Sequence, residues 1–412
     1  APLAALLGTC TGSAPAPTPT PTETPVDLGP AEPEAERILE HVRVLSQEIG
    51  PRPAGSAEEE EVIAYAREQL EGWGYQVEVQ TFTATRPDFQ RPTTLTVEQP
   101  ERRELTAVSF QGGGAGAVSG RLVDAGTGRE EEFPPDARGA VVLLQRRDVT
   151  FADMARRAEA AGAIAAVVAN KEPGLFSGDL DPPSTLPFLA IDQADGEALR
   201  ELLARPGGLE VALRVDAQTE VIAHNVVARP QSGRCRTLSG GHYDSVPWAA
   251  GANDNASGSG LVLELARTVA AAGLSDHCFA LFGAEEVGLQ GSAFFVSELS
   301  DVERDELEVA FNYDVVGGDA QPLAMGGSDL LERTETLAGQ LGLEVDISAP
   351  KDDISSDHRS FLDAGIPALM LTTPEFDLIH TAGDTLANLR ATFLDAVATL
   401  GFALLEQPAP GP

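Results

Sequence analysis

The sequence predicts an α/β protein, a three-layer sandwich with a largely parallel central sheet, which a small strand-rich inserted domain interrupts. Two observations support this fold class. From residue 219 to residue 408, apolar runs of strand length alternate with stretches of helical periodicity. Between residues 105 and 218, short apolar runs with few charges follow the breaker cluster Gly112-Gly-Gly-Ala-Gly, so strands dominate that region.

Composition divides the chain into four segments. Residues 1–33 hold a short apolar stretch and a Pro/Thr-rich spacer, because repeated prolines lack hydrogen-bond donors and favour extended geometry. Residues 34–104 form the first part of the main domain, residues 105–218 form the insert, and residues 219–408 form the second part. We expect any ligand site in the second part, since sheets of this class bind ligands beyond the carboxyl ends of their strands.

The elements follow in order from two kinds of pattern. Apolar residues recurring every three or four positions predict helices, and short buried or alternating runs bounded by glycine or proline predict strands. Gly55-Ser56 supplies a helix N-terminus before the second helix. The predicted helices are 38–49, 62–72, 153–161, 260–271 and 389–405, and the predicted strands are 75–82, 118–123, 140–144, 164–169, 186–191, 237–242, 278–282, 309–312 and 368–371.

Length and charge exclude several classes of protein. The 412 residues are enough for two domains, and an apolar fraction of 42% suits a buried core. With 28 Lys+Arg against 64 Asp+Glu, the formal net charge of −36 disfavours nucleic acid and anionic membrane surfaces as partners. No apolar run has transmembrane length, and three cysteines are too few for a disulfide scaffold.

The first ten residues end in Cys10 and read like the end of a signal-peptide apolar region. They resemble a bacterial lipobox, in which the cysteine is lipidated after cleavage, although Thr9 is atypical at its position. We therefore expect an exported protein, either extracellular or a cell-surface lipoprotein attached to the membrane only through a lipid on Cys10. The alternative is a tail that carries an incidental cysteine.

Five short segments each place metal-ligand side chains just after an apolar run. Imidazole and carboxylate groups suit two Zn²⁺ ions, provided that one carboxylate bridges them. Taken singly, each segment has an ordinary alternative as a turn, a solvated acidic pair or a structural histidine. The chain has only six histidines, however, and two of them fall in this set. The segments are Gly241-His242-Tyr-Asp244-Ser245, Gly251-Ala-Asn-Asp254-Asn255, Gly283-Ala-Glu285-Glu286, Asn312-Tyr-Asp314 and Ile379-His380-Thr381.

The order of these motifs resembles the co-catalytic di-zinc aminopeptidase family, which includes secreted bacterial leucine aminopeptidases. The resemblance covers about residues 34–95 and 220–405. Residues 105–218 resemble a protease-associated domain, which is often inserted into this family. The segments that carry the resemblance are Gly50-Pro-Arg-Pro-Ala-Gly55, Gly251-Ala-Asn-Asp-Asn-Ala-Ser-Gly, Phe282-Gly-Ala-Glu-Glu-Val-Gly-Leu-Gln-Gly-Ser, Ser356-Asp-His358, His380-Thr-Ala-Gly-Asp-Thr and, in the insert, Gly139-Ala-Val-Val-Leu-Leu and Leu186-Pro-Phe-Leu-Ala-Ile191.

The resemblance implies a role for each residue. Glu285 would be the general base, Asp244 would orient the first imidazole, and the peptide bond after the bridging aspartate would be cis. Some relatives place an oxyanion-stabilising tyrosine where this chain has Ile379, so here zinc and another donor would have to stabilise the oxyanion. The implied ligands are His242 and Asp314 for one zinc, Glu286 and His380 for the other, and Asp254 as the bridge.

The expected function is therefore a zinc-dependent exopeptidase that removes N-terminal residues from peptides or proteins. Three alternatives stay open. A glutaminyl cyclase would share the fold but use one zinc, and a carboxypeptidase would need basic groups for the substrate carboxylate. A receptor-like relative would have lost ligands, whereas this chain keeps the full set.

The spacing of two cysteines predicts a disulfide. Cys235 lies seven residues before His242, and Cys278 lies seven residues before Glu285. Both cysteines should therefore sit near the start of parallel strands that end at the same site. If those strands are neighbours, an exported protein could join Cys235 to Cys278.

Overall fold

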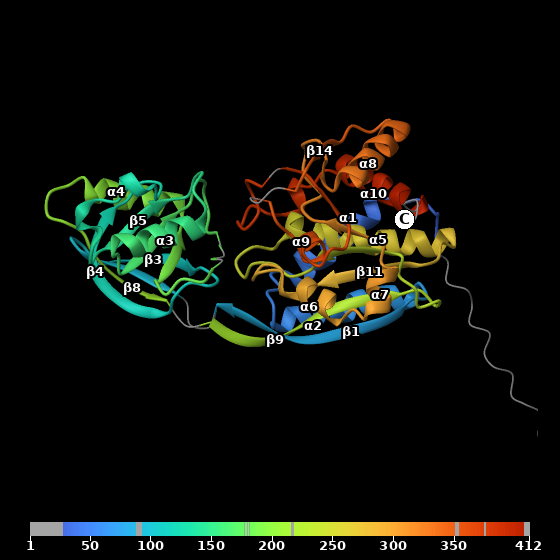
Figure 1. Cartoon of the computed structure of the whole chain (residues 1–412), viewed down its shortest axis with the longest axis horizontal. Helices are drawn as coiled ribbons and strands as arrows, with labels where there is room; N and C mark the ends of the chain where they lie inside the picture. Colours follow the sequence, from blue (N-terminus) through green and yellow to red (C-terminus); the bar gives the residue numbers. More distant parts are fainter. Residues whose placement is uncertain are drawn as a thin grey trace, which may run out of the picture.

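The computed structural model describes residues 28–87, 93–176, 178, 180, 182–215, 218–350, 354–374 and 376–407. The predicted lipidation site Cys10 lies outside these residues. Figure 1 shows two units, an α/β unit and a strand-rich unit that lies beyond the ends of the long strands β1 (Gln76–Pro87) and β9 (Gln218–Arg229). Within the described ranges, no helix is both long and apolar enough to span a membrane.

The α/β unit is built on an eight-stranded sheet in the order β1-β9-β11-β10-β12-β15-β13-β14. Its central strands β11, β10, β12 and β15 are all parallel to their neighbours within this group, and the antiparallel pairs β1–β9, β9–β11 and β13–β15 flank it. The predicted fold class is confirmed. The strands added here are β10 (Thr237–His242), β11 (His277–Phe282), β12 (Val309–Tyr313), β13 (Leu323–Gly326), β14 (Asp346–Ser348) and β15 (Ala368–Thr372).

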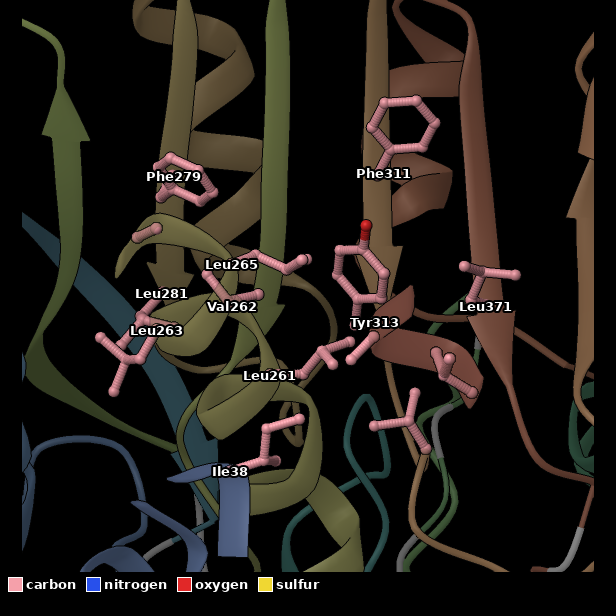
Figure 2. Close-up of a cluster of buried hydrophobic side chains, with 14 of the residues drawn as sticks. Ile38, Leu261, Val262, Leu263, Leu265, Phe279, Leu281, Phe311, Tyr313 and Leu371 are labelled. Carbon is pink, nitrogen blue, oxygen red and sulfur yellow. The ribbon is translucent and has the colours of Figure 1, made fainter. Parts of the chain in front are cut away.

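Helices cover both faces of this sheet. Alternation along β11 explains the three layers, because Phe279 and Leu281 join one core while Cys278, Ala280 and Phe282 join the other. Figure 1 shows α5 on one side of β11 and α6 on the other, and Figure 2 shows α5 side chains packed beside strand residues of the larger core. The first face carries α1 (Ala35–Arg43), α2 (Ala57–Gly72), α5 (Gly258–Ala272), α8 (Ser328–Leu341) and α10 (Ala391–Glu406), and the second carries α6 (Gln290–Glu298), α7 (Asp301–Glu306) and α9 (His358–Asp363).

The first two helices differ in how well their predicted bounds agree with the structure. The helix predicted over 38–49 is α-helical only to Arg43 and continues as a wider π-type turn over Val44–Ile49. The next helix begins where Gly55-Ser56 predicted, because the Ser56 side chain accepts a hydrogen bond from the Glu59 N–H.

The inserted unit is a closed barrel in the strand order β2-β3-β7-β6-β5-β4-β8. The predicted boundary at residue 105 falls inside β3, and β2 already belongs to the barrel. Strand β2 pairs locally with β3, but its other partner, β8, lies more than a hundred residues later, and local sequence does not reveal that pairing. The elements are β2 (Thr94–Gln99), β3 (Arg103–Ser109), β4 (Gly116–Asp124), β5 (Val141–Gln145), α3 (Phe151–Ala161), β6 (Ala165–Ala169), β7 (Phe188–Ile191), α4 (Gln193–Leu203) and β8 (Glu210–Val215).

Two register relations position the site and the insert. Pro87 lies opposite Gln218 in the antiparallel β1–β9 pair, so the chain enters and leaves the barrel through adjacent strand ends. Strands β10 and β11 run parallel with Leu238 opposite Cys278, and a disulfide joins Cys235 to Cys278 with their Cα atoms 5.3 Å apart. The strand that follows Cys235 and the strand that carries Cys278 are thus neighbours.

Candidate metal centre

The carboxyl ends of the parallel strands deliver the candidate ligands. β10 ends at His242, β12 ends just before Asp314, and β11 ends three residues before Glu285. His380 lies in the loop that follows β15, and Asp254 lies in the turn before α5. Because parallel strands share one carboxyl edge, these five side chains converge although up to 138 residues separate them.

Two groups of three ligands share Asp254. The His242 Nε2 atom lies 3.3 Å from Asp254 Oδ1 and 3.3 Å from Asp314 Oδ1. The His380 Nε2 atom lies 2.9 Å from Asp254 Oδ2 and 2.9 Å from Glu286 Oε2. Within each group the candidate ligand atoms all lie within 4.8 Å of one another. Each oxygen of Asp254 therefore faces a different histidine.

The donor set fits zinc in chemistry and spacing. Ligand atoms about 2.0–2.2 Å from a tetrahedral zinc lie about 3.3–3.6 Å apart, close to the distances around His242. The Oε1 atom of Glu286 is buried and has no hydrogen-bond partner among the described residues, which leaves it free to serve an ion. A set of nitrogen and carboxylate donors with one shared carboxylate is what two zinc ions require.

The turn that carries Asp254 is tied to the end of β12. The peptide bond between Asp254 and Asn255 is cis, as the family resemblance implied. The Asn255 side chain donates to the Tyr313 carbonyl at 2.9 Å and accepts from the Gly258 N–H at 2.8 Å. A Cβ atom on Gly258 would lie 2.1 Å from the Tyr313 carbonyl oxygen, so only glycine fits here.

Asp384 supports the bridging aspartate, and sequence reasoning missed this role. Its carboxylate accepts from the Asn253 N–H at 2.7 Å and from the Asp254 N–H at 3.1 Å. Burial raises the pKa of Asp384 to about 6. The only sequence signal was its place in the segment His380-Thr-Ala-Gly-Asp, which the family resemblance already included.

Asp244 acts on more than the imidazole. Its carboxylate accepts from the N–H groups of Glu285 and Glu286, at 3.1 and 3.3 Å. The His242 Nδ1 atom lies 3.2 Å from the Asp244 main-chain oxygen and 3.6 Å from the carboxylate. The imidazole is thus oriented mainly by the backbone of Asp244, while its side chain anchors the loop after β11.

Glu285 lies beside the two ligand groups and belongs to neither. Its Oε2 atom is 3.9 Å from His242 Nε2, and its side chain keeps 13% of its surface exposed. Burial raises the pKa of Glu285 well above its ordinary value. The preceding residue, Ala284, has a φ of 59°, an uncommon value for a residue with a side chain that turns the loop sharply after β11.

A cavity of about 370 Å³ opens next to the second ligand group. Its wall contains three aspartates and one arginine, so its charge is negative. A larger cavity of about 910 Å³ lies at the opposite edge of the sheet, beside the amino ends of β12 and β15. The residues lining the smaller cavity are Asn253, Gly318, Asp319, Asp377, Leu378, Ile379, Asp384, Asn388, Leu389 and Arg390.

The inserted unit reaches the rim of this site. A Cβ atom on Gly174 would lie 2.7 Å from the Cγ2 atom of Thr381, the residue after His380. The Gln111 side chain also donates to the Thr85 carbonyl at 3.2 Å. The barrel therefore contacts the α/β unit next to one of the candidate ligands.

Comparison with known proteins identifies the family. The model of peptidase family M28 matches residues 225–405, and the PA domain model matches residues 118–199. The chain is 30% identical over 378 residues to the aminopeptidase YwaD of Bacillus subtilis, covering 86% of this chain and 81% of that protein. The chain belongs to peptidase family M28.

Solved structures agree with membership of family M28. The structure of a zinc aminopeptidase from Bacillus subtilis is 28% identical to this chain and has a TM-score of 0.76. The match covers 90% of this chain and 95% of that one. A glutaminyl cyclase from Porphyromonas gingivalis is 15% identical with a TM-score of 0.51 over 92% of this chain and 99% of that one. At that identity the cyclase shares the fold alone. The M28 match spans all five candidate ligands, and the PA match lies within the inserted barrel.

Proposed function

We propose that this chain is a two-zinc aminopeptidase that hydrolyses N-terminal peptide bonds. His242, Asp254 and Asp314 would hold one ion, and Asp254, Glu286 and His380 the other. The observation that carries the proposal is the shared carboxylate of Asp254, which turns one oxygen toward each histidine. When bound, the two zinc ions supply Lewis-acid chemistry, polarising a carbonyl and lowering the pKa of water toward about 7.

In this proposal Glu285 is the general base. Its carboxylate takes a proton from the attacking water while the water oxygen adds to the scissile carbonyl carbon. It then gives that proton to the amine nitrogen as the C–N bond breaks, so one residue serves both steps. Its place beside His242 Nε2, outside both ligand groups, supports this role because the carboxylate stays free to carry a proton.

The negative cavity favours an aminopeptidase over a carboxypeptidase. Asp319, Asp377 and Asp384 line it against Arg390 alone, so a substrate ammonium group is attracted and a substrate carboxylate is repelled. Arg52, a further cation near the ligands, points its side-chain donors at main-chain carbonyls. It therefore offers little to a substrate carboxylate.

The remaining alternatives have less support. A glutaminyl cyclase needs one zinc, whereas the second ligand group is complete here. A receptor-like relative would have lost ligands, yet all five remain, and the relatives at 28–30% identity described above are aminopeptidases.

Substitutions of the adjacent Glu285 and Glu286 test the proposal, because one should lower turnover and the other should lower zinc binding. Glu285→Gln keeps the shape but cannot accept a proton, so turnover on aminoacyl-nitroanilides should fall by about 100- to 10,000-fold with both zinc ions retained. Glu286→Ala removes a ligand, so bound zinc and thermal stability should both fall. Metal analysis beside steady-state kinetics on both variants measures these effects.

Glu332→Gln is the matched control, because Glu332 is an exposed glutamate on α8 and should leave both readouts unchanged. If Glu285→Gln loses zinc, or keeps near-normal turnover, the assignment of base and ligand is wrong. If the wild-type chain binds two zinc ions but cleaves no aminoacyl-nitroanilide, the aminopeptidase proposal itself fails.

We also propose that the protein is exported. The Cys235–Cys278 disulfide supports this, because such bonds persist mainly in oxidising compartments. Expression of the natural full-length protein in a bacterial host, followed by cell fractionation and fatty-acid labelling, tests both parts. Label that survives in Cys10→Ala would contradict lipidation at that residue, and a cytoplasmic protein would contradict export.

A further inference from the structure

A buried arginine from the start of the chain lies behind the metal centre. Arg52 is fully buried, and within the described residues no carboxylate comes within ion-pair distance of its guanidinium. Burial lowers its pKa to about 10, so it stays charged at neutral pH. A buried charge is costly unless many hydrogen bonds satisfy it, so the partners of Arg52 show what it holds.

Two weaker partners are the carbonyls of Leu45 and Gly50 in the same N-terminal segment, at 3.5 and 3.2 Å. The shorter hydrogen bonds go to the two loops that carry His242 and Asp254. The guanidinium donates to the carbonyl of Tyr243, directly after His242, and to those of Ala250 at 2.7 Å and Gly251 at 2.9 Å. Its main-chain N–H donates to the Ser245 hydroxyl at 3.1 Å. One side chain therefore fixes the spacing between the loop after β10 and the turn before α5.

The fit around this guanidinium is tight. Gly251 has a φ of 59°, and a Cβ atom there would lie 2.7 Å from Ser245 Cβ and 3.3 Å from an Arg52 terminal nitrogen. Tyr243 is also held at its other end, since its hydroxyl lies 2.6 Å from the buried carboxylate of Glu59. The segment from Arg52 to Glu59 thus holds residue 243 from both sides.

We propose that Arg52 is a positioning residue that sets the distance between the ligands His242 and Asp254 and thereby the metal affinity of their group. The inference rests on the metal centre of the proposed function. It predicts an asymmetry. Two of three ligands in the His242–Asp254–Asp314 group sit on loops that Arg52 holds, but only Asp254 does so in the group with Glu286 and His380.

Arg52→Met removes the donors at similar volume, and Arg52→Lys keeps the charge but loses the planar fork of donors. We expect the affinity of the His242–Asp254–Asp314 group to fall by about 10- to 100-fold in both variants, the usual effect of losing a group that orients metal ligands. The affinity of the other group should change far less. Titration of metal-free protein with Zn²⁺ against a competing chromophoric chelator measures both.

Double variants assign the loss to one group. In a Glu286→Ala background the His242–Asp254–Asp314 group remains as the strong site. Adding Arg52→Lys should lower the Zn²⁺ affinity of that group by about 10- to 100-fold. In an Asp314→Ala background the His380 group remains, and adding Arg52→Lys should change it little. Equal weakening in the two backgrounds would overturn the proposal, and so would a wild-type affinity in Arg52→Lys.

Arg267→Met is the matched control for a merely structural role. Arg267 is also buried and donates to main-chain carbonyls, those of Leu28, Pro30 and Glu32, but it lies on α5 away from the ligands. It should lower the melting temperature of the metal-free protein without changing the ratio of the two affinities. If Arg52→Lys also lowers the melting temperature and leaves the ratio of the two affinities unchanged, Arg52 merely supports the fold and the proposal fails. This test measures metal binding and not activity. A wild-type protein that binds two ions but has no peptidase activity would therefore contradict the proposed function and leave this test valid.

Discussion

The Cys235–Cys278 disulfide should stabilise the α/β unit by an amount that follows from its loop. The bond closes 43 residues of chain. With that loop length, the chain-entropy relation gives a loss of about 13 cal/mol/K in the unfolded state, or about 4 kcal/mol at 25 °C. Reducing the bond should therefore lower the free energy of unfolding by up to about 4 kcal/mol.

The comparison of oxidised and reduced wild-type protein isolates the cross-link. Reduction removes neither sulfur atom, so the fully buried Cys278 side chain still fills its place in the core. An alanine variant would leave a cavity there. The chain has two tryptophans, Trp73 and Trp248, and both lie in the α/β unit. Urea unfolding followed by tryptophan fluorescence thus reports this unit without interference from the barrel.

Activity should respond differently from stability. The disulfide lies at the amino ends of β10 and β11, while the ligands follow their carboxyl ends, and the strand pairing from Leu238 to His242 stays intact without the bond. Turnover at 25 °C should therefore stay within about twofold after reduction, as expected for features that share no contacts. A stability change below about 1 kcal/mol would refute the loop-closure reasoning, and lost turnover in folded, reduced protein would refute the separation of the two strand ends.

Two further predictions concern other parts of the chain. Burial lowers the pKa of His41 from 6.5 to about 4, so the unfolded chain binds more protons between these values and stability falls as the pH drops through that window. His41→Gln should spare about 2 kcal/mol of the loss between about pH 6.5 and about pH 4.5, measured by urea unfolding, and an unchanged loss would contradict a neutral buried imidazole. Since Pro87 and Gln218 are register partners, residues 88–217 can be replaced by an Asn-Gly turn that closes β1 and β9 as a hairpin. The ratio of kcat/KM for long over short peptides should rise in this variant if the barrel restricts access beside His380, whereas an unchanged ratio would make the insert inert in substrate choice.

The sequence alone determined the types of several elements and the residue types that meet at the candidate site. Helical spacing and short buried runs are local properties, so α5, β10, β11, β12 and α10 were predicted to within a few residues. The ligand types could be read because each follows an apolar run, and parallel strands bring their carboxyl ends to one edge. The cysteine spacing worked for the same reason, since two strands ending at one site also begin at one depth.

Only the tertiary structure decided what joins distant segments. Arg52 reaches carbonyls 191 to 199 residues away, and Asp384 accepts from N–H groups 130 and 131 residues away. The start of the barrel at β2 depends on pairing with β8, and no local pattern in Thr94–Gln99 identifies that partner. Propensity and periodicity act over a few residues, whereas these contacts form only when the closed fold brings buried polar groups together, where each must find a partner.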